Sequence, residues 1–181
     1  RLEKGAQIVK DVNREVARII GINPAARTTC VKPSGNASVL LQTASGIHAE
    51  HSPMYIRNVQ MNKESEITQA IMKTNPYMVE ESVWSAGGTD VVVSFPILPN
   101  KGSMYKDDLL GVKHLELVKK AQKHWVEAGT NEELCADKGV RHNVSNTIIV
   151  DDWDEVEKYV FENRHSFAGI SFLPMTGDKD Y

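Results

Sequence analysis

The residues from Thr28 to Thr43 have the composition of an anion-binding corner. A β-branched run, Thr28–Lys32, is typical of a strand and is ended by Pro33, and Ala37–Thr43 is typical of a helix. The first N–H groups of a helix lack an acceptor inside the helix, and its dipole favours an anion there, most often a phosphate. The candidate anion corner therefore follows Pro33 and contains Gly35 with the side-chain donors Ser34, Asn36 and Ser38.

Two interpretations of this corner stay open at the level of its residues. Gly35 would let a ligand approach the backbone, and the neighbouring Ser and Asn side chains add hydrogen-bond donors. The same residues would equally suit an ordinary helix N-cap without a ligand. The corner is not a nucleotide P-loop, because no Gly-Lys-Ser/Thr follows a four-residue gap.

Histidines and cysteines offer weaker chemistry. His48 and His51 could face one metal ion, but their loop supplies no third close ligand, so we interpret them as loop histidines and predict no metal site. Cys30 lies on the strand that leads to the corner, where we expect it to pack as a small apolar residue. Cys135 lies among acidic residues, which oppose thiolate formation. We assign no catalytic residue to the chain.

Hydrophobic periodicity predicts alternating helices and strands around this corner. An opening helix is expected over 6–20 with Gly21 as its stop, and Asp151 or Asp152 could cap a late helix. The expected strands are Thr28–Lys32, Tyr55–Met61, Val91–Phe95, Val144–Val150 and Ile170–Leu173. The other expected helices are Ala37–Thr43, Glu64–Thr74, Leu109–Glu127 and Asp154–Asn163. Val91–Phe95 lacks polar alternation, which favours a strand buried on both faces, so we predict an α/β fold with a mainly parallel sheet.

Composition limits the classes of protein. The 181 residues carry a formal charge of −3, without a Lys/Arg tract, so we expect no nucleic-acid partner. No apolar stretch approaches the roughly 20 residues of a membrane span, and two distant cysteines make no disulfide framework, so we expect a cytoplasmic location. The chain lacks an initiator Met and begins inside a helical pattern. We expect residues 1–181 to be a single partial domain, truncated at both ends.

Several motifs follow one another along the chain: Val31-Lys-Pro-Ser-Gly35, Ala44-Ser-Gly-Ile-His48, Tyr55-Ile-Arg57, Val140-Arg-His-Asn-Val-Ser-Asn-Thr147 and Gly169-Ile-Ser-Phe-Leu-Pro-Met-Thr-Gly-Asp178. In this order they resemble the adenosylcobalamin-dependent (class II) ribonucleotide reductases. The resemblance implies a ten-stranded α/β barrel, of which this chain would be about the second half. It also places the substrate phosphates on Pro33, Ser34, Gly35, Asn36 and Ala37, with Ser38 in the following turn. Lys32 precedes the corner and could add positive charge or equally face solvent, and Arg57 and Arg141 are further candidates.

The same resemblance implies reduction of a ribonucleotide at its 2′ carbon by a thiyl radical that adenosylcobalamin starts, with thioredoxin or a similar dithiol as reductant. The segment around 138–147 favours the monomeric triphosphate type. The family's Asn-x-Cys-x-Glu finger loop is absent from this sequence, so the radical cysteine and the general base are expected elsewhere. Two departures are Asn36, where the family usually has Thr, and Ala49, where Pro usually follows the His. The alternatives are a diphosphate reductase of the same class, or a nucleotide- or phosphate-binding α/β module without radical chemistry.

Overall fold

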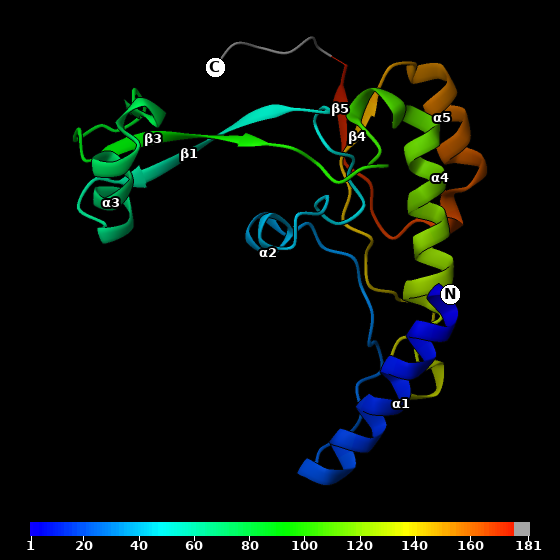
Figure 1. Cartoon of the computed structure of the whole chain (residues 1–181). Coiled ribbons are helices and arrows are strands. Elements are labelled where there is room, and N and C mark those ends of the chain that lie inside the picture. The colour runs from blue at the N-terminus through cyan, green and yellow to red at the C-terminus, as the bar shows by residue number, and fades with distance from the viewer. Residues whose placement is uncertain (176–181) are drawn as a thin grey trace. The chain divides into compact units, whose positions relative to one another are not determined.

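The computed structural model describes residues 1–175, which form two compact units. The first unit consists of residues 1–50 and the chain from 102 onward, and the second unit consists of residues 51–101. Thr176–Asp178, the end of the last motif, lies outside the described residues. Figure 1 shows the elements of both units, which together make a mixed α/β structure.

Helix α1 (Leu2–Ile20) opens the first unit and confirms the expected helix and its stop. Gly21 ends it with a φ of 75°, a left-handed conformation that glycine adopts without the steric cost of a Cβ atom. The helix packs on the six-residue segment η3 (Gln122–Glu127), where a Cβ atom on Gly5 would lie 3.3 Å from the indole of Trp125. The lack of a Cβ atom on Gly5 therefore allows the close approach.

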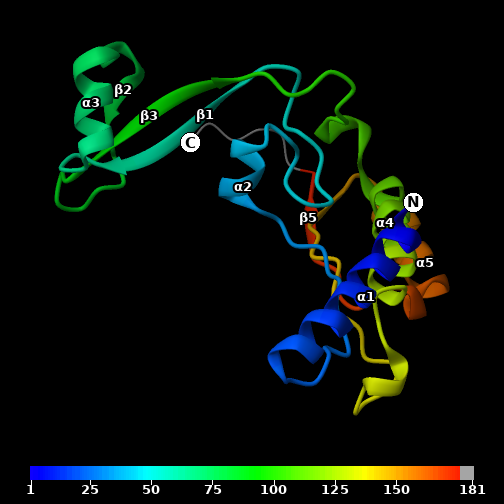
Figure 2. The same cartoon turned by 60° about the horizontal axis from the view of Figure 1, so that its bottom comes forward.

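Two further helices lie side by side in the first unit (Figures 1 and 2). Helix α4 (Gly111–Ala121) continues directly into η3, which is a π-helix, and α5 (Trp153–Glu162) packs against α4. Asp152 caps α5, since its side chain accepts a hydrogen bond from the Glu155 N–H at 3.1 Å. The predicted cap and the predicted α4 and α5 segments are confirmed, apart from one or two residues at their ends.

Parallel pairing joins three extended segments of the first unit. Strand β4 (Ile148–Val150) pairs with β5 (Phe172–Pro174), and Val31 makes an isolated parallel bridge to Val144. The predicted strands here are only partly confirmed: 28–32 carries one bridge, and β5 begins two residues later than predicted. Side chains from 144 to 150 nevertheless alternate between buried and half-buried, as an extended segment with one face on a core requires.

The hydrophobic core of the first unit lies between these segments and the α4–α5 pair. It is assembled from residues that are far apart in the sequence, and none of its members is more than 8 % exposed: Leu115, Val118, Ala121, Val126, Val144, Ile148, Val150 and Val156. Shorter helical segments complete this unit: α2 (Gly35–Leu40), η2 (Lys106–Asp108), η4 (Glu132–Leu134) and η5 (Arg164–Ser166). In both views α2 lies on the opposite side of β4 and β5 from α4 and α5.

The second unit corrects the prediction of a mainly parallel sheet. Strands β1 (Tyr55–Asn62) and β2 (Val79–Glu81) both pair antiparallel with the central strand β3 (Asp90–Ile97). The apolar run in β3 had suggested burial on both faces, but only Val91 and Val93 are buried while their neighbours are half-exposed. A central antiparallel strand can be covered on one face alone, so an apolar run does not establish parallel pairing.

Helix α3 (Glu66–Thr74) and the short η1 (Pro76–Met78) connect β1 to β2 within the second unit. Thr68 of α3 is fully buried, although apolar residues elsewhere in the unit, such as Tyr77 and Trp84, are largely exposed. Among the described residues, no helix is long and apolar enough to cross a membrane.

Candidate functional site

The predicted corner forms at the end of the first extended segment, where α2 begins. Ser34 is the N-cap: its side-chain oxygen accepts a hydrogen bond from the Ala37 N–H at 3.1 Å. The N–H groups of Gly35 and Asn36, at the first two helical positions, have no acceptor inside the helix. Gly35 is exposed, and a Cβ atom built on it would meet nothing within 4 Å, so the space beside its backbone is open.

Ser38 takes a supporting position in this corner. It is 7 % exposed, and its hydroxyl donates to the Ser34 carbonyl. The hydroxyl is therefore engaged inside the corner and does not point outward. Pro33 and Ala37 are exposed on the surface of the turn, and the side chain of Asn36 lies outside the described part of the structure.

A second turn, formed by residues 44–48, supports the corner through hydrogen bonds to Ser34. Ser45 binds both the N–H and the carbonyl of Ser34 through its hydroxyl group. The hydroxyl oxygen accepts a hydrogen bond from the Ser34 N–H at 2.9 Å, and the hydroxyl proton is donated to the Ser34 carbonyl at 3.2 Å. Gly46 has a φ of 63°, and a Cβ atom on it would lie 3.0 Å from the Lys32 carbonyl oxygen. Only glycine combines that conformation with that close approach at low cost.

Two histidines fix this second turn to the rest of the first unit. The two ring nitrogens of His48 contact the Ser45 carbonyl at 2.9 Å and the Thr147 N–H at 3.0 Å. His114 of α4 is 3 % exposed, packs edge-on against His48 with 5.8 Å between ring centroids, and contacts the Ile47 carbonyl through Nε2 at 3.0 Å. Burial, with a smaller contribution from His48, lowers the pKa of His114 to about 4.

Sequence reasoning did not find this support. The motif 44–48 is present in the sequence, but the partners of Ser45 and His48 lie up to 99 residues away in the chain. The available signal was local: Ser45 is followed by Gly46 and lies three residues before His48, in a loop that follows the corner. That pattern indicates a turn but does not identify what the turn contacts.

The three basic residues predicted as further phosphate contacts, Lys32, Arg57 and Arg141, lie in different surroundings. Lys32 is exposed beside the corner. Arg141 forms an ion pair with Glu132 and lines a polar cavity of about 430 Å³ together with Gln122 and His165. Arg57 belongs to the second unit, where its guanidinium contacts the Tyr55 hydroxyl at 3.2 Å. Arg141 is thus engaged by Glu132 within the first unit, and a role of Arg57 in phosphate binding stays a prediction.

One of the two cysteines differs from expectation. Cys30 was predicted to pack, but its side chain is exposed. The reason is the alternation of an extended segment: Thr29 on one side of it is buried, and Cys30 faces the opposite way. Cys135 is buried, with its thiol directed at the Asn131 carbonyl at 3.4 Å.

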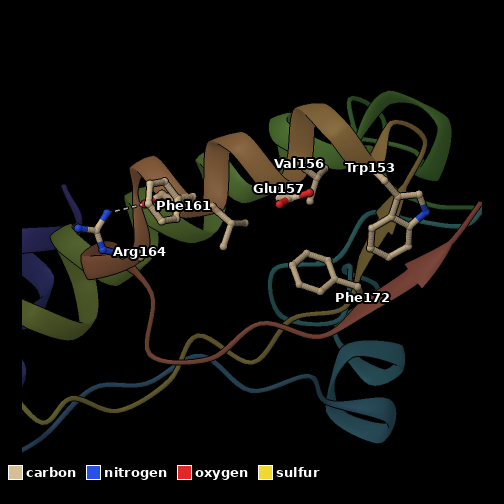
Figure 3. A pocket seen from close by; sticks show the side chains of 7 residues that line it. Trp153, Val156, Glu157, Phe161, Arg164 and Phe172 are labelled. Atoms are coloured by element: carbon tan, nitrogen blue, oxygen red, sulfur yellow. Dashed lines mark hydrogen bonds between the residues drawn. The ribbon is translucent and has the colours of Figure 1, made fainter.

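A second cavity of the first unit has the opposite chemistry. An apolar pocket of about 490 Å³ lies between α5 and β5, and Figure 3 shows the side chains that line it. Trp153 and Phe172 lie against each other with ring centroids 6.0 Å apart, and Arg164 lies over the ring of Phe161. Its lining is mostly aliphatic and aromatic, so it suits packing against another apolar surface better than binding an anion.

Curated proteins similar to this chain agree on one class of enzyme. A Dictyostelium discoideum protein, named a probable adenosylcobalamin-dependent ribonucleoside-triphosphate reductase, is 25% identical over 173 residues, 94% of this chain. Proteins with the corresponding name from Euglena gracilis and Levilactobacillus brevis are 24% and 23% identical, over 96% and 94% of this chain. The resemblance to the adenosylcobalamin-dependent reductases is confirmed.

The fold of these reductases is also similar. The crystal structure of a B12-dependent class II ribonucleotide reductase superimposes with a TM-score of 0.73 over 99% of this chain, at 18% identity. This chain covers 24% of that protein and about a fifth of the length of the curated reductases, 21% for the Dictyostelium protein. No protein-family profile matches the sequence.

Proposed function

We propose that this chain is the substrate-binding segment of an adenosylcobalamin-dependent ribonucleoside-triphosphate reductase, with Pro33–Ser38 as its site for the substrate phosphates. The observation that carries the proposal is the geometry of the corner. The N–H groups of Gly35 and Asn36 have no acceptor inside the helix and lie beside open space at Gly35. The turn that carries them is held by the hydrogen bond between the Ser34 N–H and the Ser45 hydroxyl. The names of the similar proteins support a triphosphate as the substrate.

The position of the corner in the fold supports the same proposal. The segment that contains Val31 runs parallel to the segment that contains Val144, and the corner follows its carboxyl end. In open α/β sheets, ligands bind at the carboxyl ends of the parallel strands. We propose that these segments and β4–β5 are strands of a partial ten-stranded barrel, and that both units belong to one catalytic domain.

The corner's contribution to the reaction is to bind and orient. Phosphate oxygens would accept hydrogen bonds from the Gly35 and Asn36 N–H groups, and the Ser34 hydroxyl can donate while its oxygen still caps the helix. A hydrogen bond to a charged group contributes about 1.5–3 kcal/mol, and it would hold the phosphates, and with them the attached ribose, in one position relative to the corner.

The radical chemistry is proposed for the complete enzyme. Adenosylcobalamin, when bound, would start a thiyl radical for reduction at the 2′ carbon, and thioredoxin or a similar dithiol would restore the cysteines of what we propose is a monomeric enzyme. We assign no residue of this chain to the cofactor. Among residues 1–175 there is no group of three or more His, Cys, Asp or Glu side chains that could hold a separate metal ion. Cys30 and Cys135 receive no redox role.

The test is a set of substitutions at the corner in the complete enzyme. Gly35→Val should weaken triphosphate binding most, because the branched side chain would fill the open space beside the backbone. Ser34→Ala should raise the apparent KM about tenfold or more, corresponding to about 1.5–3 kcal/mol, and Asn36→Thr should be tolerated. The measurement is kcat and KM for a ribonucleoside triphosphate.

Gly87→Val is a matched control in the second unit. Gly87 is also exposed and has no positive φ, so this variant reports the general cost of a valine at an exposed glycine. The proposal is wrong if Gly35→Val folds normally and binds the triphosphate as tightly as the parent and the Gly87→Val variant.

A further inference from the structure

His48 has a hydrogen-bonding arrangement that only one form of its ring satisfies. The Thr147 N–H lies 3.0 Å from Nε2, and a backbone amide can only donate, so Nε2 must carry a lone pair. The proton of the neutral ring is then on Nδ1, which donates to the Ser45 carbonyl at 2.9 Å. A protonated ring would direct a second N–H at the Thr147 donor. The opposite tautomer would place two protons face to face at Thr147 and two lone pairs face to face at Ser45.

The Ser45 contact connects this ring to the anion corner. Ser45 presents its carbonyl to His48 and its hydroxyl to both backbone groups of Ser34. Ser34 in turn immediately precedes the two N–H groups that we assign to the phosphates. One residue thus lies between the imidazole and the cap of α2.

The Thr147 contact connects the ring to the edge of the hydrophobic core of the first unit. Thr147 directly precedes β4, and Ile148 at the start of β4 is fully buried in the core. His114 covers the ring from α4 and is itself held by the Ile47 carbonyl. The imidazole of His48 therefore has a fixed partner on each side, one in the corner's support and one at the edge of the core.

We propose that His48, as the neutral Nδ1–H tautomer, is a positioning residue for the anion corner. Through Ser45 it sets the orientation of Ser34 and so the direction of the Gly35 and Asn36 N–H groups toward the terminal phosphates of a polyphosphate ligand. The proposal rests on the proposed function of the corner. It assigns to His48 a role in affinity and orientation without contact with the substrate.

The first test identifies the tautomer. In the complete protein labelled with ¹⁵N-histidine, a long-range ¹H–¹⁵N correlation spectrum at pH 7 should show the His48 proton on Nδ1 and an unprotonated Nε2. The His48→Asn variant assigns the signal by its disappearance. A proton on Nε2, or on both nitrogens, overturns the proposal.

The second test separates the two hydrogen bonds. His48→Asn keeps an amide donor at the position of Nδ1 and should bind inorganic tripolyphosphate within about threefold of the parent. His48→Gln places its amide farther from the backbone, near Nε2, so it loses the Ser45 contact and should bind about tenfold more weakly. Ser45→Ala should weaken binding as much, and the double variant of Ser45→Ala with His48→Gln no further, because the two residues act in series. His51→Gln is the control, since His51 is exposed in the second unit.

The outcomes distinguish this proposal from the function on which it rests. If Gly35→Val leaves tripolyphosphate binding unchanged, the proposed function of the corner fails. If Gly35→Val abolishes binding while His48→Gln binds like the parent, the corner stands and the role of His48 is overturned. An equal loss in His48→Asn and His48→Gln also overturns it, since the geometry distinguishes their contacts.

Discussion

The two units of the molecule bury their side chains in different ways. In the first unit the core combines α4, β4, α5 and the bridge at Val144, elements that are separated by long stretches of chain. In the second unit, 51 contiguous residues make an antiparallel sheet that buries Val91 and Val93, while β1 contains no buried residue. The contrast shows that the candidate site belongs to the part of the chain where long-range packing determines geometry.

This difference predicts where a substitution will matter. A unit with non-local contacts loses several partners at once when one core residue is truncated, whereas a locally connected sheet can loosen without affecting residues far along the chain. The following predictions test that difference, from the largest effect to the smallest.

Truncation of the core beside the site should have the largest effect. Ile148→Ala removes a fully buried side chain at the start of β4 and should lower the free energy of unfolding by about 2–5 kcal/mol. It should also weaken phosphate binding, because Thr147 is the adjacent residue. Val93→Ala, the matched change in the second unit, should reduce the hydrogen-exchange protection of β1–β3 amides without changing phosphate affinity. A loss of affinity in Val93→Ala as large as in Ile148→Ala would contradict the division into two units.

Acid should destabilise the first unit through His114. The pKa of His114 is lowered from 6.5 to about 4 in the folded chain, so the unfolded chain binds a proton in this range while the folded chain does not. The stability that the neutral ring contributes is complete above pH 6.5 and is lost as the pH falls toward 4, by up to about 3 kcal/mol. Urea unfolding of the parent and of His114→Gln at pH 7 and pH 5 measures it. The parent should lose more stability than the variant, and equal losses would contradict the assignment.

The smallest effect is expected from the surface of the second unit. Lys63 and Glu81 form an ion pair at 2.6 Å, with the Glu81 side chain 74% exposed. Glu81→Gln should change stability by less than about 1 kcal/mol, and the difference should shrink further in 1 M salt because exposed pairs are screened. Thermal unfolding at low and high salt measures it. A change that is large and independent of salt would show that this surface contributes more to the unit than its exposure indicates.

Sequence patterns predicted those parts of the fold that depend on nearby residues. The period of α1, its stop at Gly21, the cap at Asp152 and the Ser34–Gly35 turn are all decided within one or two turns of chain, so the sequence was sufficient. The direction of pairing of β3 was predicted wrongly, because its partners are chosen by tertiary packing. Strand β2, Val79–Glu81, was missed because three residues with two glutamates carry no strand period.

The candidate site divides in the same way. Its cap and open glycine were predictable because they lie within the corner itself. Ser45 and His48 were not, since their roles depend on Ser34 and Thr147, and Ser38 was expected to face the ligand although its hydroxyl turns inward.

The π-helix η3 has a consequence for how this region tolerates changes in length. A π-turn holds one more residue than an α-turn, so it is what a one-residue insertion leaves behind in a helix. Here the extra residue places the Trp125 indole N–H on the Cys30 carbonyl at 3.0 Å and the Trp125 carbonyl on the Thr29 hydroxyl at 2.6 Å. Deleting one residue before Trp125 would restore an ordinary helix but rotate that side chain by about 100° away from both partners. The register of the helix is therefore fixed by the extended segment at Thr29 and Cys30, and gaps in this stretch should be far rarer in evolution than gaps in the loop at 85–88.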